Sequence, residues 1–232
     1  MPLSQDDMDT LIDLRQKGVS YRKCVKEIGG TSEQQLRSAW WRYCQQNSTD
    51  WIQEERLAFL DIEAGGLEAN SSYMLSWVLK PRKGEPQHAI ITKKEIMSGE
   101  LDRRIVQTLL KALQKVDVVV TYYGTGYDLP YIRTRSMMHG LEFPAFGTLK
   151  HYDVYYTVKS KLRLHRNRQE VACDTLGIEG KDHVQMALWQ KAKLGDPVAL
   201  AEVLSHNLRD VLTLEALFER MRPHARILRK SV

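Results

Sequence analysis

The sequence predicts an α/β domain that follows a small domain of three helices. From residue 55 onward, apolar strand-like segments alternate with amphipathic helical segments. Before residue 50, three short helical segments are separated by turns that contain glycine. The polar stretch "NSTD" at 47–50 divides the two patterns and reads as a linker. We therefore expect domains at 1–50 and 51–232.

Composition and charge are those of an ordinary soluble globular protein. The chain has 232 residues, of which 43% are hydrophobic and 27% are charged. The net charge of +5 favours an anionic partner, although a basic surface with no particular partner fits the charge equally well. Residues 1–50 hold seven Lys/Arg and seven Asp/Glu, so the positive excess lies after residue 50.

The three cysteines, Cys24, Cys44 and Cys173, are widely spaced and odd in number, which argues against a disulfide framework or a zinc site. We expect reduced thiols in a cytoplasmic protein. The first ten residues are acidic and polar, so no signal peptide is expected. Apolar runs stay well below the length of a membrane span, so we expect no membrane contact.

The N-terminal segments have recognisable helix ends. Met8 and Leu11 fall on one face of the first segment, and Gly18 follows it. Ser20 can cap the second segment, which stops at Gly29. Short helices with tight turns are typical of a helix-turn-helix unit. The expected helical ranges are 6–18, 19–30 and 31–46.

The larger domain begins with strands and ends with helices. The first three strands form an antiparallel meander, because only short turns connect them. The β-branched run "VDVVVTYYG" is typical of a buried parallel strand. Strands are expected at 56–64, 73–80, 88–92 and 116–124, helices at 99–117 and 128–140, a strand that turns into a helix at 149–158, and mostly helix thereafter.

Two acids end the first strand. Side chains of a strand alternate between faces, so Asp61 and Glu63 point to one side while Ile62 points into the core. Adjacent carboxylates repel each other, and a hard cation such as Mg²⁺ or Mn²⁺ removes that repulsion. The alternative is a solvated strand end with an incidental pair of acids.

Further acids occur at two later points. Asp128, in "YYGTGYDLPYI", follows the fourth strand and opens a helix, where it can act as a helix cap or as a metal ligand. His206 and Asp210, in "SHNLRDVLTLEAL", are four residues apart on one side of a late helix. They can contribute to a shared site or form a surface ion pair.

The ordered combination of these motifs resembles the DEDD exonuclease superfamily, which has an RNase H-like fold. The segments "LDIEAGGL", "VVTYYGTGYDLPYI" and "HNLRDVLTLEAL" are similar to its three motifs, and in particular to those of the YprB-type, PolB-exonuclease-related subfamily. The resemblance covers about residues 55–222 and implies an RNase H-like mixed sheet flanked by helices. It places the four metal-binding acids at Asp61, Glu63, Asp128 and Asp210.

The sequence departs from this family at two positions. Tyr123 stands where relatives usually carry Asn, and His206 stands where one branch carries Tyr. A histidine-bearing branch places its His five residues before the acid rather than four. The resemblance therefore implies that His206 is the base, or a substitute with weaker activity. Asp153, similar to a common family acid, is expected to support the site from behind the metal ligands.

By this resemblance the chain is a 3′–5′ exonuclease that hydrolyses the phosphodiester bonds of DNA or RNA with two Mg²⁺ or Mn²⁺ ions, about 3.5–4 Å apart. Asp61 would bridge the ions, and Glu63 and Asp210 would complete the ligands of one. Asp128 would hold the other ion. His206 would orient or deprotonate the attacking water.

Basic and aromatic residues suggest where nucleic acid binds. The segment 158–168 can bind phosphates, although the solvated face of an amphipathic helix explains the same pattern. Tyr127 can stack on a terminal base, with core packing as the alternative. Arginines of the third N-terminal helix can read base edges, unless this module docks a protein. The basic residues are Lys159, Lys161, Arg163, Arg166 and Arg168 in the segment and Arg37 and Arg42 in the helix.

Two other functions fit the same motifs. One is a structure-specific endonuclease, because a fold alone does not set a preference for strand ends. The other is a non-catalytic nucleic-acid-binding regulator with a decayed site. The presence of all four acids argues against the regulator, whereas His206 and Tyr123 keep it open.

Overall fold

The computed structural model of the protein describes residues 3–17, 19–46, 56–145, 147–180, 185–224 and 230–231. The chain forms two compact units, Met1–Glu54 and Glu55–Val232. The expected linker at 47–50 lies outside the described residues. Within the described ranges, no helix combines the length and the apolar character that crossing a membrane requires.

The first unit consists of three helices close to the expected ranges. Ser4 caps the first helix, since its Oγ accepts the N–H of Asp7 at 3.1 Å. Gly29 ends the second helix with a φ of 68°, a conformation that glycine adopts at no steric cost. The helices are α1 (Gln5–Gln16), α2 (Tyr21–Ile28) and α3 (Glu33–Gln46).

Each helix of this unit contributes to one small core. Leu11 from α1, Cys24 from α2 and Leu36 from α3 are fully buried against one another. Cys24 and Cys173 are both buried, whereas the side chain of Cys44 lies outside what the structure describes. The structure therefore confirms three packed helices.

The second unit is built on a six-stranded mixed sheet with the order β3-β2-β1-β4-β5-β6. The first three strands form the predicted antiparallel meander, and β4 lies parallel to both β1 and β5. The short β6 pairs with β5 in the antiparallel direction. The strands are β1 (Leu57–Ala64), β2 (Met74–Pro81), β3 (Gln87–Ile90), β4 (Val118–Thr121), β5 (Lys150–Asp153) and β6 (Lys230–Ser231).

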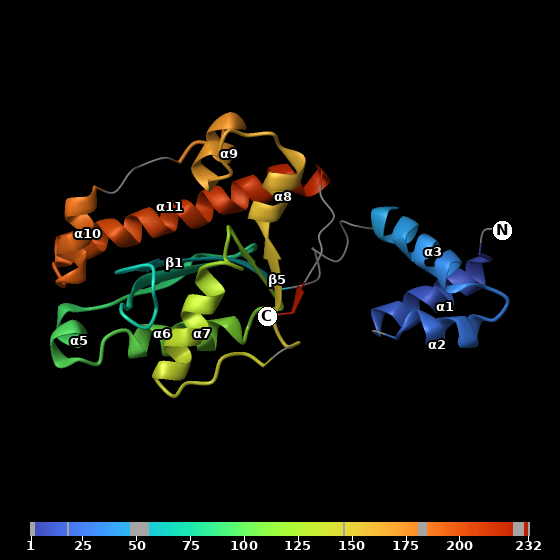
Figure 1. Ribbon diagram of the computed structural model, residues 1–232, viewed down its shortest axis with the longest axis horizontal. Coiled ribbons are helices and arrows are strands. Elements are labelled where there is room, and N and C mark those ends of the chain that lie inside the picture. The colour runs from blue at the N-terminus through green and yellow to red at the C-terminus, as the bar shows by residue number, and fades with distance from the viewer. Residues whose placement is uncertain are drawn as a thin grey trace. The chain divides into compact units, whose positions relative to one another are not determined.

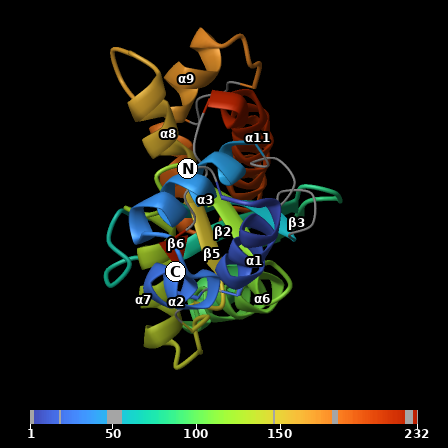
Figure 2. The ribbon, with the colours of Figure 1, turned by 90° about the vertical axis from the view of Figure 1, so that its right-hand side faces the viewer.

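Helices cover both faces of this sheet, which gives the predicted α/β fold. The long helix α11 and the short α8 and α9 lie on one face, and α6 and α7 lie on the other (Figure 1). The view turned by 90° shows the same layers with the strands between them (Figure 2). The helices are α5 (Lys93–Ser98), α6 (Arg103–Leu113), α7 (Asp128–Met138), α8 (Val154–Lys161), α9 (Gln169–Thr175), α10 (Met186–Lys193) and α11 (Pro197–Met221), followed by a 3-10 turn at Arg222–His224.

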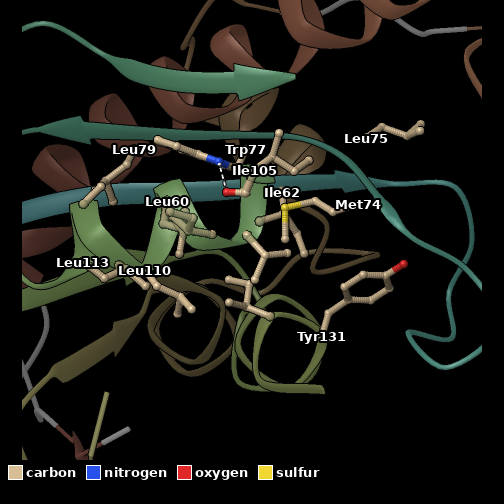
Figure 3. Packing of buried hydrophobic residues seen from close by; sticks show 14 of the residues in the cluster. Leu60, Ile62, Met74, Leu75, Trp77, Leu79, Ile105, Leu110, Leu113 and Tyr131 are labelled. Atoms are coloured by element: carbon tan, nitrogen blue, oxygen red, sulfur yellow. Dashed lines mark hydrogen bonds between the residues drawn. The ribbon is translucent and has the colours of Figure 1, made fainter. Parts of the chain in front are cut away.

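Strand β1 contributes to the core on both of its faces. Leu60 and Ile62 point toward α6, where Trp77 of β2 donates its indole N–H to the carbonyl of Ile105 at 2.7 Å (Figure 3). On the other face, the ring of Phe59 lies 5.5 Å from that of Phe218 on α11. Alternate residues of β1 therefore face α6 and α11.

Two elements were not predicted, and one of them has a clear sequence signal. Helix α5 begins with a capping box, in which Thr92 Oγ1 accepts the N–H of Glu95 at 3.3 Å and Glu95 Oε2 accepts the N–H of Thr92 at 2.8 Å. The spacing Thr-x-x-Glu is visible in the sequence. Strand β6 is only two residues long, too short for any periodicity to show.

Candidate active site

Strand β1 carries two acids beyond the end of its parallel neighbour. The pairing of β1 with β4 ends at Phe59 and Val120, so Asp61 and Glu63 extend past β4. Both lie on the face that Phe59 presents to α11. Ile62 lies on the opposite face and is 3% exposed, as predicted. The alternation of the strand thus directs both carboxylates toward α11.

Asp128 is the first residue of α7, and strand β1 fixes its carboxylate. The N–H of Ile62 donates to Asp128 Oδ1 at 3.1 Å, and Asp128 is 3% exposed. Tyr127 occupies the N-cap position without a side-chain cap bond. The interpretation of Asp128 as a helix cap is therefore wrong, because its carboxylate bonds to a strand 66 residues earlier.

Two glycines shape the loop between β4 and Asp128. The N–H of Gly124 donates to Thr121 Oγ1 at 3.1 Å, and a Cβ at Gly124 would lie 2.2 Å from that oxygen. A Cβ at Gly126 would lie 2.6 Å from the ring of Tyr123. A side chain at either position would therefore displace its neighbour, which explains why the motif carries glycine twice.

Asp153, at the end of β5, holds the same loop from the neighbouring strand. Its carboxylate accepts the N–H of Tyr123 at 2.8 Å and that of Thr125 at 3.0 Å. It also accepts the N–H of Tyr155 at 3.1 Å and so caps the N-terminus of α8. Asp153 thus supports the position of Asp128 indirectly, because it holds the loop that leads to Asp128.

Helix α11 brings the late pair of residues to β1. His206 Nε2 lies 3.4 Å from Asp210 Oδ2 and 3.7 Å from Glu63 Oε1. The ligand atoms of these three side chains all lie within 4.8 Å of one another. His206 Nδ1 is buried and has no hydrogen-bond partner among the described residues. The alternative of a simple surface pair on the helix does not fit, since Glu63 of β1 completes the group.

Burial and mutual repulsion disfavour the charged form of every acid in this group. Burial, followed by the charges of Asp128, Glu63 and Asp210, raises the pKa of Asp61 well above its usual range. The pKa of Glu63 is raised by burial and then by Asp210 and Asp128. Asp61 is not one of the three residues whose ligand atoms lie within 4.8 Å of one another, but its carboxylate interacts electrostatically with Glu63 and Asp210 of that group.

The two helical acids respond in the same direction. Burial raises the pKa of Asp128 to about 7, although the N–H of Ile62 partly offsets this effect. Burial also raises the pKa of Asp210, and the nearby His206 and Arg209 oppose the rise. Without a counter-charge, burial and neighbouring charges therefore disfavour the ionised form of all four carboxylates.

Tyr127 lies at the edge of this group rather than in open solvent. Its hydroxyl donates to the carbonyl of Gly66 at 3.4 Å, and its ring lies 5.6 Å from that of Tyr131. Burial, then Tyr131 and the acids at 128, 63 and 61, raises the pKa of Tyr127. Its hydroxyl thus binds the loop that follows β1, and the site acids are close enough for their charges to act on it.

Sequence reasoning missed Asn207, which joins α11 to the strands. Asn207 and Ser76 are both fully buried, and the Asn207 amide lies 3.1 Å from Ser76 Oγ. In the orientation that satisfies both of its ends, the amide donates to the carbonyl of Asp61 and accepts the N–H of Glu63, each at 3.3 Å. The sequence does contain a signal, because this amide interrupts the buried stripe of Val203 and Val211 at a spacing of four.

The basic segment is not one amphipathic helix. Helix α8 ends at Lys161, so Lys159 and Lys161 occupy its last turn and the arginines lie in the connection to α9. Hydrogen bonds tie this connection to the site. Tyr122 donates its hydroxyl to the carbonyl of Asn167, and Gln169 Nε2 donates to the carbonyl of Asp210, both at 2.8 Å. The segment residues Lys159, Lys161, Arg163, Arg166 and Arg168 are all exposed.

The two remaining predicted residues belong to the first unit. Arg37 and Arg42 are exposed on α3. The guanidinium of Arg37 lies 4.7 Å from the ring centroid of Tyr21 and 3.6 Å from Glu33 Oε2. Arg42 Nε donates to the carbonyl of Ser38 at 3.4 Å.

Comparisons with known proteins agree with this fold. A solved family B DNA polymerase from the hyperthermophilic archaeon Pyrobaculum calidifontis is similar with a TM-score of 0.57 and 17% identity. The match covers 72% of this chain and 24% of that chain, so it spans about a quarter of the polymerase, and at this identity it shows the fold alone. The comparison with curated proteins yields no match. A family model described as the RNase H superfamily matches residues 58–222, well over half of the sequence, and the chain belongs to that superfamily.

Proposed function

We propose that the chain is a divalent-metal-dependent 3′–5′ exonuclease that hydrolyses phosphodiester bonds of DNA or RNA. The observation that carries the proposal is the convergence of Asp61 and Glu63 from β1 with Asp128 and Asp210 from two separate helices. Membership in the RNase H superfamily supports a nuclease. The similarity to part of a DNA polymerase is consistent with a nucleic-acid substrate.

The residues of this site fit divalent metal ions. Glu63, His206 and Asp210 offer three ligand atoms within 4.8 Å, and the carboxylates of Asp61 and Asp128 add oxygen donors. Hard oxygen ligands suit Mg²⁺ or Mn²⁺, and the proposal assigns two such ions to the four acids. When bound, the ions would supply a water of lowered pKa and would neutralise charge on the scissile phosphate.

We assign to His206 the handling of the proton of the attacking water. Its imidazole lies between two carboxylates, at 3.4 Å and 3.7 Å, which can hold the ring once it is protonated. Lining up the ring in this way requires the α11–β1 contact, because His206 and Glu63 come from opposite ends of the domain sequence. Asp153 supports the site indirectly through the loop before Asp128.

We include two narrower assignments in this proposal. One is the YprB-type, PolB-exonuclease-related subfamily, based on the three motifs. The other is a helix-turn-helix that binds DNA through α3, supported by the exposure of Arg37 and Arg42. In the full chain, Arg42→Ala should weaken duplex binding and reduce its salt dependence, whereas an exposed acid-to-amide change such as Glu33→Gln should not weaken it. Equal binding by Arg42→Ala and the parent would remove the DNA-binding assignment.

Hydrolysis of end-labelled oligonucleotides tests the central proposal. With a 5′ label, we expect products that shorten from the 3′ end in Mg²⁺ or Mn²⁺ and none in a chelator. Asp61→Asn should abolish the activity, and Asp117→Asn, which changes a carboxylate paired with Arg56 outside the site, should retain it. A contaminating nuclease would leave Asp61→Asn as active as the parent. Cleavage of a circular or 3′-blocked strand would indicate an endonuclease instead.

A further inference from the structure

A cluster of tyrosines lies beside the loop that leads to Asp128, and two of its rings face solvent. Tyr123 and Tyr156 are each 48% exposed. The half-buried Tyr155 lies between them, with ring centroids 4.9 Å from Tyr123 and 5.2 Å from Tyr156 in edge-to-face contacts. Core packing explains Tyr155, but it does not explain two neighbouring rings left half in water.

The backbone holds Tyr123 in a conformation that tyrosine rarely adopts. Its φ is +63°, in the left-handed region that favours glycine and asparagine. Asp153 Oδ1 accepts the N–H of both Tyr123 and Tyr155, so a single carboxylate fixes these two rings relative to each other. The ring of Tyr123 rests over Gly126, two residues before Asp128. Strain of this kind persists only where the surroundings enforce it.

Basic residues begin beside the tyrosines at the end of α8 and continue in the connection to α9. Lys159 Nζ lies 5.7 Å from the ring centroid of Tyr155. The five basic side chains of the segment defined above are exposed, and no ion pair to another described residue engages them. The hydrogen bonds of Tyr122 to Asn167 and of Gln169 to Asp210 keep this segment beside the loop that leads to Asp128 and beside α11.

We propose that Tyr123 and Tyr156 form a stacking surface for unpaired bases and that the segment from Lys159 to Arg168 binds the phosphates of the same strand. This surface would lead single-stranded nucleic acid to the acids around Asp128. Stacking suits any base, because every base has a flat aromatic face, whereas the faces of paired bases are already covered in a duplex. The inference rests on the proposed nuclease function for its direction, but the binding step needs no hydrolysis.

Binding in a chelator tests the surface separately from the chemistry. The full-length protein is titrated into fluorescent oligo-dT, oligo-rU and a blunt duplex of equal length, with anisotropy as the readout. Tyr123→Asn removes one ring while keeping a residue that tolerates the backbone conformation, and Tyr156→Ala removes the other. We expect Kd for the single strands to rise about fivefold or more for each ring removed. Tyr123→Phe and Tyr156→Phe should bind as the parent does.

The charge arm of the test uses matched substitutions. Arg166→Gln should reduce the slope of log Kd against log salt by about one. Lys111→Gln, exposed on α6 across the sheet, should leave that slope as it is. The dT and rU arms identify whether DNA or RNA is the preferred strand.

The outcomes separate this inference from the nuclease proposal. If both ring deletions bind single strands as tightly as the parent, or if they weaken duplex binding as much as strand binding, the stacking surface does not exist. Each protein is also incubated with labelled strand and Mg²⁺. Ring-dependent binding without hydrolysis would overturn the nuclease and keep the surface. Hydrolysis without any effect of the rings on binding would do the reverse. Circular dichroism verifies that each variant is folded.

Discussion

The side-chain amide of Asn207 on α11 lies 3.1 Å from the hydroxyl of Ser76 on β2, and both residues are fully buried. Asn207 lies between His206 and Asp210 along α11, and its amide also bonds to the backbone of Asp61 and Glu63 on β1. Asn207 therefore helps to set the distance between the acids on β1 and the residues on α11.

Replacing Asn207 should weaken metal binding at the site in addition to lowering the stability of the fold. Asn207→Leu leaves the Ser76 hydroxyl without its partner, and we expect the free energy of unfolding to fall by about 1–3 kcal/mol. Val203→Ala, one turn earlier on the same buried stripe, should destabilise by a similar amount. Only Asn207→Leu should also reduce the rise in Tm on addition of Mn²⁺. Equal metal-induced shifts in the two variants would contradict this role.

The metal-free protein should lose stability as the pH rises from about 4 to about 7. The pKa of Asp128 is raised to about 7 in the folded chain, so the unfolded chain releases this proton first. The associated stability is complete below the unfolded pKa, near 4, and disappears as the pH passes about 7. Its size is on the order of 2–4 kcal/mol, with Asp61, Glu63 and Asp210 acting in the same direction.

Thermal unfolding in a chelator at several pH values measures this effect. Asp128→Asn should flatten the curve, and Mg²⁺ should raise Tm more at pH 8 than at pH 5.5, because the ions bind the ionised carboxylates. A Tm that climbs with pH in the absence of metal would show that the acids do not repel one another as their positions imply.

His206→Gln should slow hydrolysis by about 10²-fold or more while substrate binding persists. The imidazole can accept a proton between its two neighbouring carboxylates, and an amide cannot. Single-turnover hydrolysis rates, and strand binding measured in a chelator, test this in both proteins. A variant that hydrolyses the strand as fast as the parent would exclude His206 from proton transfer.

A buried ion pair on the other face of the sheet should matter for folding. Asp102, fully buried before α6, lies 2.5 Å from Arg135 Nη2 and 2.7 Å from His139 Nε2, both on or next to α7. Asp102→Ala strands the buried charge of Arg135, so we expect a loss of about 3–5 kcal/mol in denaturant unfolding. Asp117→Ala, at an exposed pair with Arg56, is the control and should change little. Equal losses in the two variants would contradict this account.

Local sequence patterns predicted most of the helices and strands. The stripe Ile105, Leu109, Ala112 and Leu113 is buried in α6, and the β-branched run at β4 is a parallel central strand, because periodicity and residue type report directly on burial. Helix α5 was not predicted although its capping box is local, since it has no fully buried residue to mark an apolar face. Helix ends differed by a few residues, as expected where ends depend on tertiary contacts.

The candidate site was only partly predictable. Spacing placed Asp61 and Glu63 on one face and His206 beside Asp210, because strand and helix periods determine both relationships. The bond from Ile62 to Asp128 and the bridge made by Asn207 join residues far apart in sequence, and no local rule reports such contacts. Phosphate binding by the basic segment 158–168 stays a prediction, and α8 ends within that segment, at Lys161.

The left-handed backbone at Tyr123 lowers the stability of the fold at the same position whose ring we propose for binding single strands. Glycine or asparagine there would relax the loop and remove one of the two exposed rings of the tyrosine cluster. A laboratory selection for thermal stability would thus favour glycine or asparagine at this position. The selected variants would unfold at a higher temperature and bind single-stranded nucleic acid more weakly.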